Sequence, residues 1–414
     1  MHNQLNKQSQ TSTYNKTWMV IVLGLLTAFG PLSMDMYLPS LPTVADDFNS
    51  TASLAQLSIT SCLIGLAIGQ LVFGPLSDIV GRKKPLLLTL TIYTIVSLLC
   101  YFSPSIWLFI ILRFIQGASA ASGIVIARAA SRDMYSGKEL TKFMALLALV
   151  NGAAPILAPL FGGVVLNWFT WRTIFVILAI IGFLMFFSVN FTLPETLSKE
   201  NRKQGDLLET LKTFGLLLKD KVFMGIALSQ AFVVMSMFAY ISGSPFVLQN
   251  IYDVSPQQFS IIFAVNGLGI IIAAQITGKL SSTIEEIKLL KGGVMLSFIG
   301  SLLLIIVVIF ALPIWAMLPA LFLVVSSAGV VNTTSFSLGM QRQGEVAGSA
   351  SAFLGILPFG GGALVSPFVG IAGEATMIPL GIVILMCSTM AFVCSTMAFV
   401  IYSILLKNKP ISVE

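Results

Sequence analysis

The sequence predicts an all-α membrane protein with twelve transmembrane helices in two pseudo-symmetric six-helix bundles. Of the 414 residues, 56% are hydrophobic and only 10% are charged, and the mean hydropathy is +0.94. A soluble domain of this size needs far more surface charge. Apolar runs of about 20 residues, the length that crosses a bilayer, recur along the chain. We predict spans at residues 18–39, 54–76, 86–103, 106–127, 143–166, 172–193, 222–248, 259–279, 289–311, 314–337, 347–369 and 376–406.

The longest polar interruption divides six spans from six. Weak internal symmetry supports two related halves, because Gly74-Pro-Leu-Ser has a counterpart in Gly278-Lys-Leu-Ser. Paired halves around a midplane site are a recurring transporter plan. We therefore expect an N-terminal tail at 1–17, a first bundle at 18–194, a cytoplasmic linker at 195–221, a second bundle at 222–406 and a C-terminal tail at 407–414.

Nearly all of the 23 Lys and Arg residues fall on one side of the predicted spans, including Arg128, Arg132, Lys138 and Lys142 in the loop expected after span four. Because cytoplasmic loops collect Lys and Arg, both termini are predicted to be cytoplasmic. This bias accounts for the net charge of +6, so no nucleic-acid partner is expected. The first apolar run is too long for a signal peptide. We expect a multi-pass protein of the cell (cytoplasmic, or inner) membrane.

Asp35 is the one acid inside the predicted spans, and Arg113 is the one base that lies away from their ends. A charge at the bilayer centre costs about 2.5–3.5 kcal/mol on insertion scales, so such residues are usually functional. The single histidine, His2, lies in the N-terminal tail, so a proton carrier must be a carboxylate. Both residues lie near the outer ends of their spans, at similar depths. We interpret Asp35 and Arg113 as a proton-coupling pair; the alternative is a purely structural ion pair.

The turn between spans two and three reads Gly74-Pro-Leu-Ser-Asp78-Ile-Val-Gly81-Arg82-Lys83-Lys84. It resembles the major facilitator superfamily signature G-x-x-x-D-x-x-G-R-[KR]. The resemblance implies the major facilitator fold and a cytoplasmic gating loop that latches one conformation. Asp78 can face a helix N-terminus, and Arg82 can pair with Asp78. The alternative is an ordinary basic turn. The gating residues implied are Gly74, Asp78, Gly81, Arg82 and Lys83.

Two further motifs indicate which branch of the major facilitator superfamily the chain resembles. In span four, Arg113-Phe-Ile-Gln116-Gly117 resembles the R-x-x-Q-G motif of proton-driven members, and these residues share one helix face. Span five resembles the antiporter motif G-x-x-x-G-P-x-x-G-G, which implies export, although Ala158 replaces a glycine of the motif. Proline and glycine bend a helix; the alternative is generic packing of small residues. The antiporter residues are Pro155, Pro159, Gly162 and Gly163.

The segment Met34-Asp-Met-Tyr-Leu-Pro resembles the span-one motif of drug/proton antiporters, and Phe238–Phe246 resembles the Bcr/CflA group of bicyclomycin- and chloramphenicol-type resistance exporters. An apolar cavity with few polar groups would suit such substrates. We expect its lining to include the following residues, with packing as the alternative for each: Met34, Tyr37, Gln116, Tyr240 and Asn266.

We therefore expect a proton-coupled multidrug efflux transporter that exports amphipathic small molecules by alternating access. The proton gradient drives it, so we expect no cofactor and no metal. The sequence contains no catalytic Ser-His or Cys-His set, so we do not expect an enzyme. We expect a monomer in the lipid bilayer. The alternative is a proton-coupled uptake carrier or facilitator for a small metabolite on the same fold.

The last span contains a tandem repeat, because Cys387–Val393 and Cys394–Val400 both read CSTMAFV. Seven residues make nearly two helical turns, so the repeat rotates the rest of the helix by only about 20°. We expect a tolerated duplication that makes the helix tilt or protrude.

Overall fold

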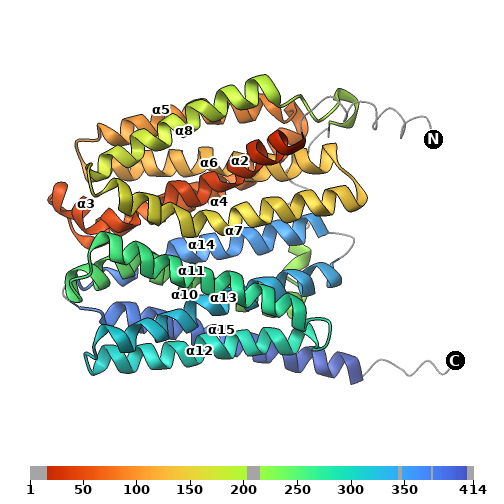
Figure 1. Cartoon of the computed structure of the whole chain (residues 1–414). Helices are drawn as coiled ribbons and strands as arrows, with labels where there is room; N and C mark the ends of the chain where they lie inside the picture. Colours follow the sequence, from red (N-terminus) through yellow and green to blue (C-terminus); the bar gives the residue numbers. More distant parts are fainter. Residues whose placement is uncertain (1–15, 203–214, 344–346, 374–375, 408–414) are drawn as a thin grey trace. The chain divides into compact units, whose positions relative to one another are not determined.

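The computed structural model describes residues 16–202, 215–343, 347–373 and 376–407, so the predicted tails and much of the predicted linker lie outside it. The described residues form helices and connecting turns, and no strand occurs among them (Figure 1). Each predicted span corresponds to one long helix. These helices are α2 (Lys16–Asp35), α4 (Ala52–Val80), α5 (Lys83–Tyr101), α6 (Ile106–Met134), α7 (Gly137–Val165), α8 (Trp171–Thr192), α10 (Lys221–Phe246), α11 (Pro256–Leu280), α12 (Glu286–Ile309), α13 (Ile314–Arg342), α14 (Ala347–Val369) and α15 (Ile378–Lys407).

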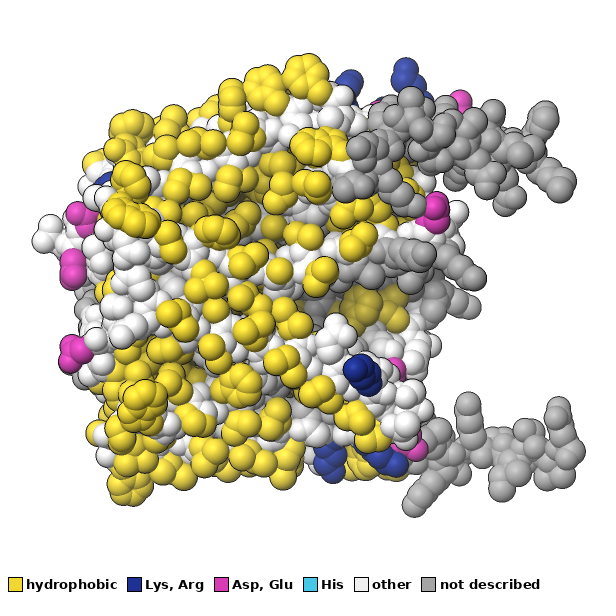
Figure 2. All heavy atoms as spheres, viewed as in Figure 1, with side chains coloured by type: hydrophobic (Ala, Val, Ile, Leu, Met, Phe, Trp, Pro, Cys, Tyr) yellow, Lys and Arg dark blue, Asp and Glu magenta, His cyan; other side chains and the backbone are white. Residues whose placement is uncertain are grey.

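Within the described ranges, 10 helical segments are long and apolar enough to cross a membrane, while α7 and α14 hold shorter apolar segments. Large hydrophobic side chains face outward along these helices, for example Phe191 at 77% exposure and Leu88 at 58%. Figure 2 shows hydrophobic side chains over most of one face, with charged groups mainly near its margins. Such a surface is stable only in contact with lipid. The all-helical membrane fold is confirmed.

The end of the first span differs from the prediction. Helix α2 stops at Asp35, and a 3-10 turn, η2 (Leu38–Ser40), and a short helix, α3 (Leu41–Asp47), follow it. Pro39 explains the break, because it has no N–H to donate to the Asp35 carbonyl and so cannot continue the helix, whereas Pro42 lies in the first turn of α3. As a result, Asp35 is the last residue of its helix.

The loop predicted after span four is much shorter than expected. Helix α6 continues to Met134, so it carries Arg128 and Arg132, and Lys138 lies in the first turn of α7. The prediction that these residues lie in a loop is wrong, because Ala127, Ala129 and Ala130 favour continuation of the helix. Long basic side chains extend to the aqueous boundary from a helix as well as from a loop.

The chain divides into two compact units, Met1–Tyr37 with Ser61–Gly205 and Leu38–Thr60 with Asp206–Glu414. In unit 1, α2 packs against α6, α7 and α8, and α5 packs against α6 and α8. In unit 2, α10 packs against α13, α14 and α15, and α12 packs against α13 and α15. The two units therefore repeat one packing pattern. Leu38–Thr60 groups with unit 2, where η2 contacts α10 and α11.

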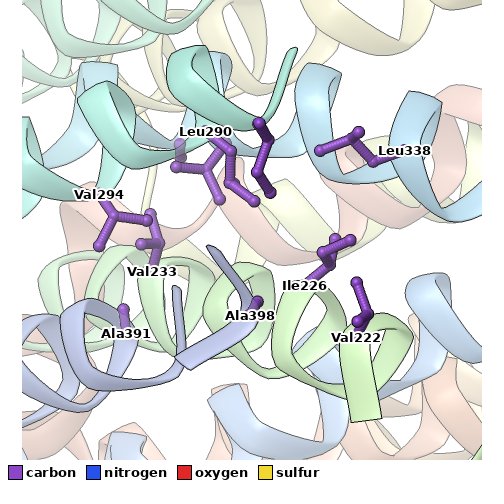
Figure 3. Packing of buried hydrophobic residues seen from close by; sticks show 11 residues of the cluster. Val222, Ile226, Val233, Leu290, Val294, Leu338, Ala391 and Ala398 are labelled. Carbon is purple, nitrogen blue, oxygen red and sulfur yellow. The ribbon is translucent and has the colours of Figure 1, made fainter. Parts of the chain in front are cut away.

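A cluster of aliphatic side chains from α10, α12, α13 and α15 forms part of the core of unit 2 (Figure 3). Both copies of the CSTMAFV repeat contribute to it, because Ala391 and Ala398 are each fully buried. The small size of Ala398 matters, since its Cβ would lie 2.7 Å from a Cβ placed on Gly225 of α10. The second copy therefore packs against α10 through Ala398. That the duplication makes the helix tilt or protrude stays a prediction.

Candidate functional site

Arg113, on α6, is fully buried among aromatic rings of unit 1. Its guanidinium carbon lies 4.5 Å from the centroid of the Tyr37 ring and 5.5 Å from that of Phe175. Phe109 packs edge-to-face against Phe175, with 5.3 Å between their centroids. A cation over an aromatic face gains about 2 kcal/mol when it is desolvated. The rings thus stabilise a charge that lies away from water.

The side-chain amide of Gln116, on the same helix, accepts a hydrogen bond from this guanidinium. Arg113 Nη1 donates to Gln116 Oε1, and Gln116 Nε2 donates to Ser97 Oγ on α5 at 2.7 Å. The prediction that Arg113 and Gln116 share a helix face is confirmed. Ser97 was not predicted; its only signal is a small hydroxyl in an apolar span.

Asp35 ends α2 and is 3% exposed. Its Oδ1 is buried with no hydrogen-bond partner among the described residues, and so are Nε and Nη2 of Arg113. The guanidinium charge acts on the carboxyl group, yet no direct ion pair joins the two in the described structure. Both groups thus keep hydrogen-bonding capacity for each other, for a proton or for a bound molecule. The neighbouring Met34 is buried at 6% exposure.

Helix α7 supports the turn that follows Asp35. Its motif residues Pro155 and Pro159 lie inside the helix, and Gly162 and Gly163 are buried in its last turns. A Cβ on Gly162 would overlap the carbonyl oxygen of Met36, so only glycine permits this approach. The motif predicted for export therefore contacts the backbone directly beside the candidate proton carrier.

At the turn between α4 and α5, Arg82 lies at the centre of a polar cluster. Its Nη1 donates to Asp78 Oδ1, as expected, and to Ser77 Oγ at 2.8 Å, while its Nε donates to Asp133 Oδ2 at 2.9 Å. Burial opposes the charge of Arg82, but its hydrogen bonds to the Asp133 and Asp78 carboxylates outweigh burial and raise the pKa of Arg82 above its ordinary value. The guanidinium stays charged at every physiological pH.

Glu195 completes this cluster from beyond α8. Its carboxylate accepts the backbone N–H of Arg82 at 2.8 Å and that of Lys83 at 3.2 Å. Gly81 adopts φ +107°, and a Cβ there would meet Glu195 Oε2 at 2.5 Å. Gly74, by contrast, faces open space. Sequence reasoning missed Asp133 and Glu195; the available signal was that a buried arginine needs acidic partners at the same boundary.

In unit 2 the predicted cavity residues Tyr240 and Asn266 meet. Asn266 Nδ2 donates to the Tyr240 hydroxyl at 2.8 Å, and the Tyr240 ring stacks on Phe263 with 5.6 Å between centroids. Both are buried. A pocket of about 440 Å³ in this unit lies elsewhere, between the α11–α12 turn (281–287) and α13. That these residues line a substrate cavity stays a prediction.

Among the described residues, no group of three or more His, Cys, Asp or Glu side chains is arranged to hold a metal ion. The described residues do bring together two groups of polar side chains. One is the hydrogen-bonded series Arg113–Gln116–Ser97 near Asp35, and the other is the Arg82 cluster at the turn between α4 and α5.

The family model described as Major Facilitator Superfamily matches residues 23–367. An uncharacterized MFS-type transporter, YdgK of Bacillus subtilis, is 43% identical over 94% of this chain and 96% of its own length. A bicyclomycin resistance protein homolog of Haemophilus influenzae is 30% identical over 91% of this chain and 93% of its own. In fold, the chain is similar to a bacterial homologue of the lysosomal transporter Spinster, captured inward-facing, with a TM-score of 0.75 at 14% identity over 96% of this chain and 100% of that one.

Proposed function

Because this chain belongs to the major facilitator superfamily and is therefore a multi-pass membrane transporter of small molecules rather than an enzyme, we propose that it exports amphipathic drug-like molecules in exchange for protons. The bicyclomycin resistance homolog supports this substrate class. Chloramphenicol- and bicyclomycin-like compounds are the first candidates.

The observation that carries the proposal is the pair of buried groups in unit 1. Asp35 and Arg113 are 3% and 0% exposed, and both retain buried polar atoms without partners among the described residues. An ion pair kept only for stability would satisfy these atoms against each other. In the proposed cycle Asp35 takes up a proton from outside and releases it inside, and Arg113 competes with the proton for the carboxylate.

The energetics of the proposed exchange favour export. A proton that enters with its charge gains about 2.3 kcal/mol per 100 mV of membrane potential, which is enough to drive a neutral drug outward. The proton gradient is then the only energy source, with no cofactor. Both termini are proposed to be cytoplasmic in the cell membrane, as the distribution of Lys and Arg indicates. The proposed working unit is a monomer.

Alternating access in this scheme needs a latch that opens and closes. The Arg82 cluster suits that role, because one buried guanidinium joins α4, through Asp78, to the end of α6, through Asp133. Release of these contacts would free the loop between α4 and α5. We propose Gly74, Asp78, Gly81, Arg82 and Lys83 as the gating loop.

Inside-out membrane vesicles test the direction of transport. Vesicles that contain this chain and are energised by respiration are expected to accumulate labelled chloramphenicol or bicyclomycin, and a protonophore is expected to abolish the accumulation. Vesicles from the same host without the chain are the control. Accumulation that persists with the protonophore would contradict proton coupling. Equilibration without accumulation would favour a facilitator, and uptake only in right-side-out vesicles would favour an uptake carrier.

A further inference from the structure

Ser97 lies within α5, fully buried against α6. Its hydroxyl oxygen accepts the Gln116 amide N–H at 2.7 Å, and Gln116 in turn accepts a hydrogen bond from Arg113. All three side chains are 0% exposed. The predicted site therefore continues into α5, a helix that carries none of the predicted proton-coupling or cavity residues.

The directions of the two hydrogen bonds that link Arg113 to Gln116 and Gln116 to Ser97 are fixed. A guanidinium can only donate, so the Gln116 carbonyl oxygen must face Arg113 and its NH₂ must point the other way. That NH₂ is buried, so it needs an acceptor, and Ser97 Oγ provides it. Arg113 excludes the turned-over amide, which would bring two donors together, and Ser97 satisfies the buried NH₂ in the orientation that remains.

The orientation of Gln116 decides which N–H groups of Arg113 remain available to other partners. With Nη1 bonded to the amide, Nε and Nη2 are the nitrogens left without partners among the described residues. The same contact restrains a guanidinium that makes no direct ion pair with Asp35 in the described structure. Weakening the restraint would let Arg113 approach the carboxylate.

We propose that Ser97 is a positioning residue for proton coupling: through Gln116 it sets how strongly Arg113 competes with a proton for Asp35. This inference rests on the proposed proton exchange. The titratable side chains that act on Arg113 or Asp35 are Tyr37 beyond α2, Cys62 on α4, and Tyr93 and Cys100 on α5.

Infrared difference spectroscopy of the full-length protein in lipid tests the inference without any drug. The carboxyl C=O band that disappears in Asp35→Asn reports protonation of Asp35, and its intensity is followed against pH. In Ser97→Ala the midpoint of the Asp35 titration is expected to fall, because a less restrained Arg113 would favour the carboxylate. The expected shift is roughly half to one pH unit, the equivalent of one hydrogen bond. Ser97→Thr restores the hydroxyl and is expected to restore the midpoint.

Ser122→Ala is the matched control. Ser122 is also buried and bonds a hydroxyl across the α5–α6 contact, to Thr89, but it lies outside the Arg113 chain. The midpoint of the Asp35 titration in Ser122→Ala should equal that of the wild type. An unchanged midpoint in Ser97→Ala, or an equal shift in Ser122→Ala, overturns the role of Ser97 alone. If no band assigned to Asp35 titrates in the wild type, both this inference and the proposed proton exchange fail.

Discussion

Arg113 is held by one amide and two aromatic rings rather than by a carboxylate. The R-x-x-Q spacing indicates the amide, because residues three apart share a helix face. Nothing in the spacing indicates Tyr37 or Phe175, which arrive from other parts of the chain. Ser97 was missed for the same reason, since a lone serine in an apolar span has many possible partners.

Arg113→Lys is expected to reduce drug export by at least about tenfold while the protein still inserts. A lysine keeps the charge, but it lacks the planar fork that bonds Gln116 and stacks on Tyr37. Efflux of chloramphenicol from a pump-deleted host measures the effect. Arg132→Lys makes the same change at an exposed position on the same helix and should export normally. Equal activity of the two variants would remove Arg113 from the coupling site.

Gly162→Ala is expected to lower the melting temperature in detergent by several degrees, because the added Cβ would overlap the Met36 carbonyl. Overpacking of this kind costs about 1–3 kcal/mol. Gly360→Ala is the matched control: it lies in α14 two residues after Pro358, where a Cβ would meet nothing within 4 Å. A melting temperature of Gly162→Ala equal to that of the control would show that α7 does not need this close approach.

At the scale of helices, the presence of each helix was easier to predict than the residues at which it begins and ends. Each apolar run became one long helix, because about 20 apolar residues satisfy their backbone in lipid only as a helix. The ends depended on local chemistry: Pro39 stops α2 at Asp35, and an alanine-rich stretch carries α6 on to Met134. The unpredicted last turns of α6 also explain why Asp133 was missed. The residue was expected in a loop, whereas it lies at the end of α6 beside Arg82.

Arg82→Gln is expected to cost about 1.5–3 kcal/mol of stability, the worth of hydrogen bonds to charged partners. The glutamine leaves Asp78 and Asp133 without their shared cation. Because the pKa of Arg82 is raised, the interaction is already complete below its ordinary pKa and is lost only at pH values above the raised one. The loss in the variant should therefore be the same across physiological pH.

Thermal unfolding of Arg82→Gln at several pH values measures this loss. Lys84→Gln removes one charge from the same turn at an exposed position and serves as the control. A melting temperature for Arg82→Gln that matches the control would contradict the structural role of the cluster.

Ala398→Leu tests whether the second CSTMAFV copy is part of the core. The larger side chain would press on Gly225 of α10, which costs about 1–3 kcal/mol. The melting temperature should fall, whereas Met397→Leu, one residue earlier and 58% exposed, should leave it unchanged. Equal tolerance of both substitutions would mean that the second copy is dispensable to packing.

At the scale of the whole chain, hydropathy and charge distribution were enough to predict the fold class, because a membrane restricts the options so strongly. The internal repeat predicted from short motifs appears as one packing pattern in both units. The units differ in chemistry: among the described residues, the buried charged side chains Asp35, Arg82 and Arg113 all belong to unit 1. This difference supports the expectation that coupling resides in the first half.

Proton release on drug binding is the most direct test of proton exchange at Asp35. The purified protein is placed in weakly buffered solution with a pH indicator, and chloramphenicol or bicyclomycin is added. The wild type is expected to release protons, Asp35→Asn none, and Asp253→Asn as many as the wild type. Asp253 is exposed with φ +55°, a conformation that asparagine adopts readily. Undiminished proton release from Asp35→Asn would contradict the account.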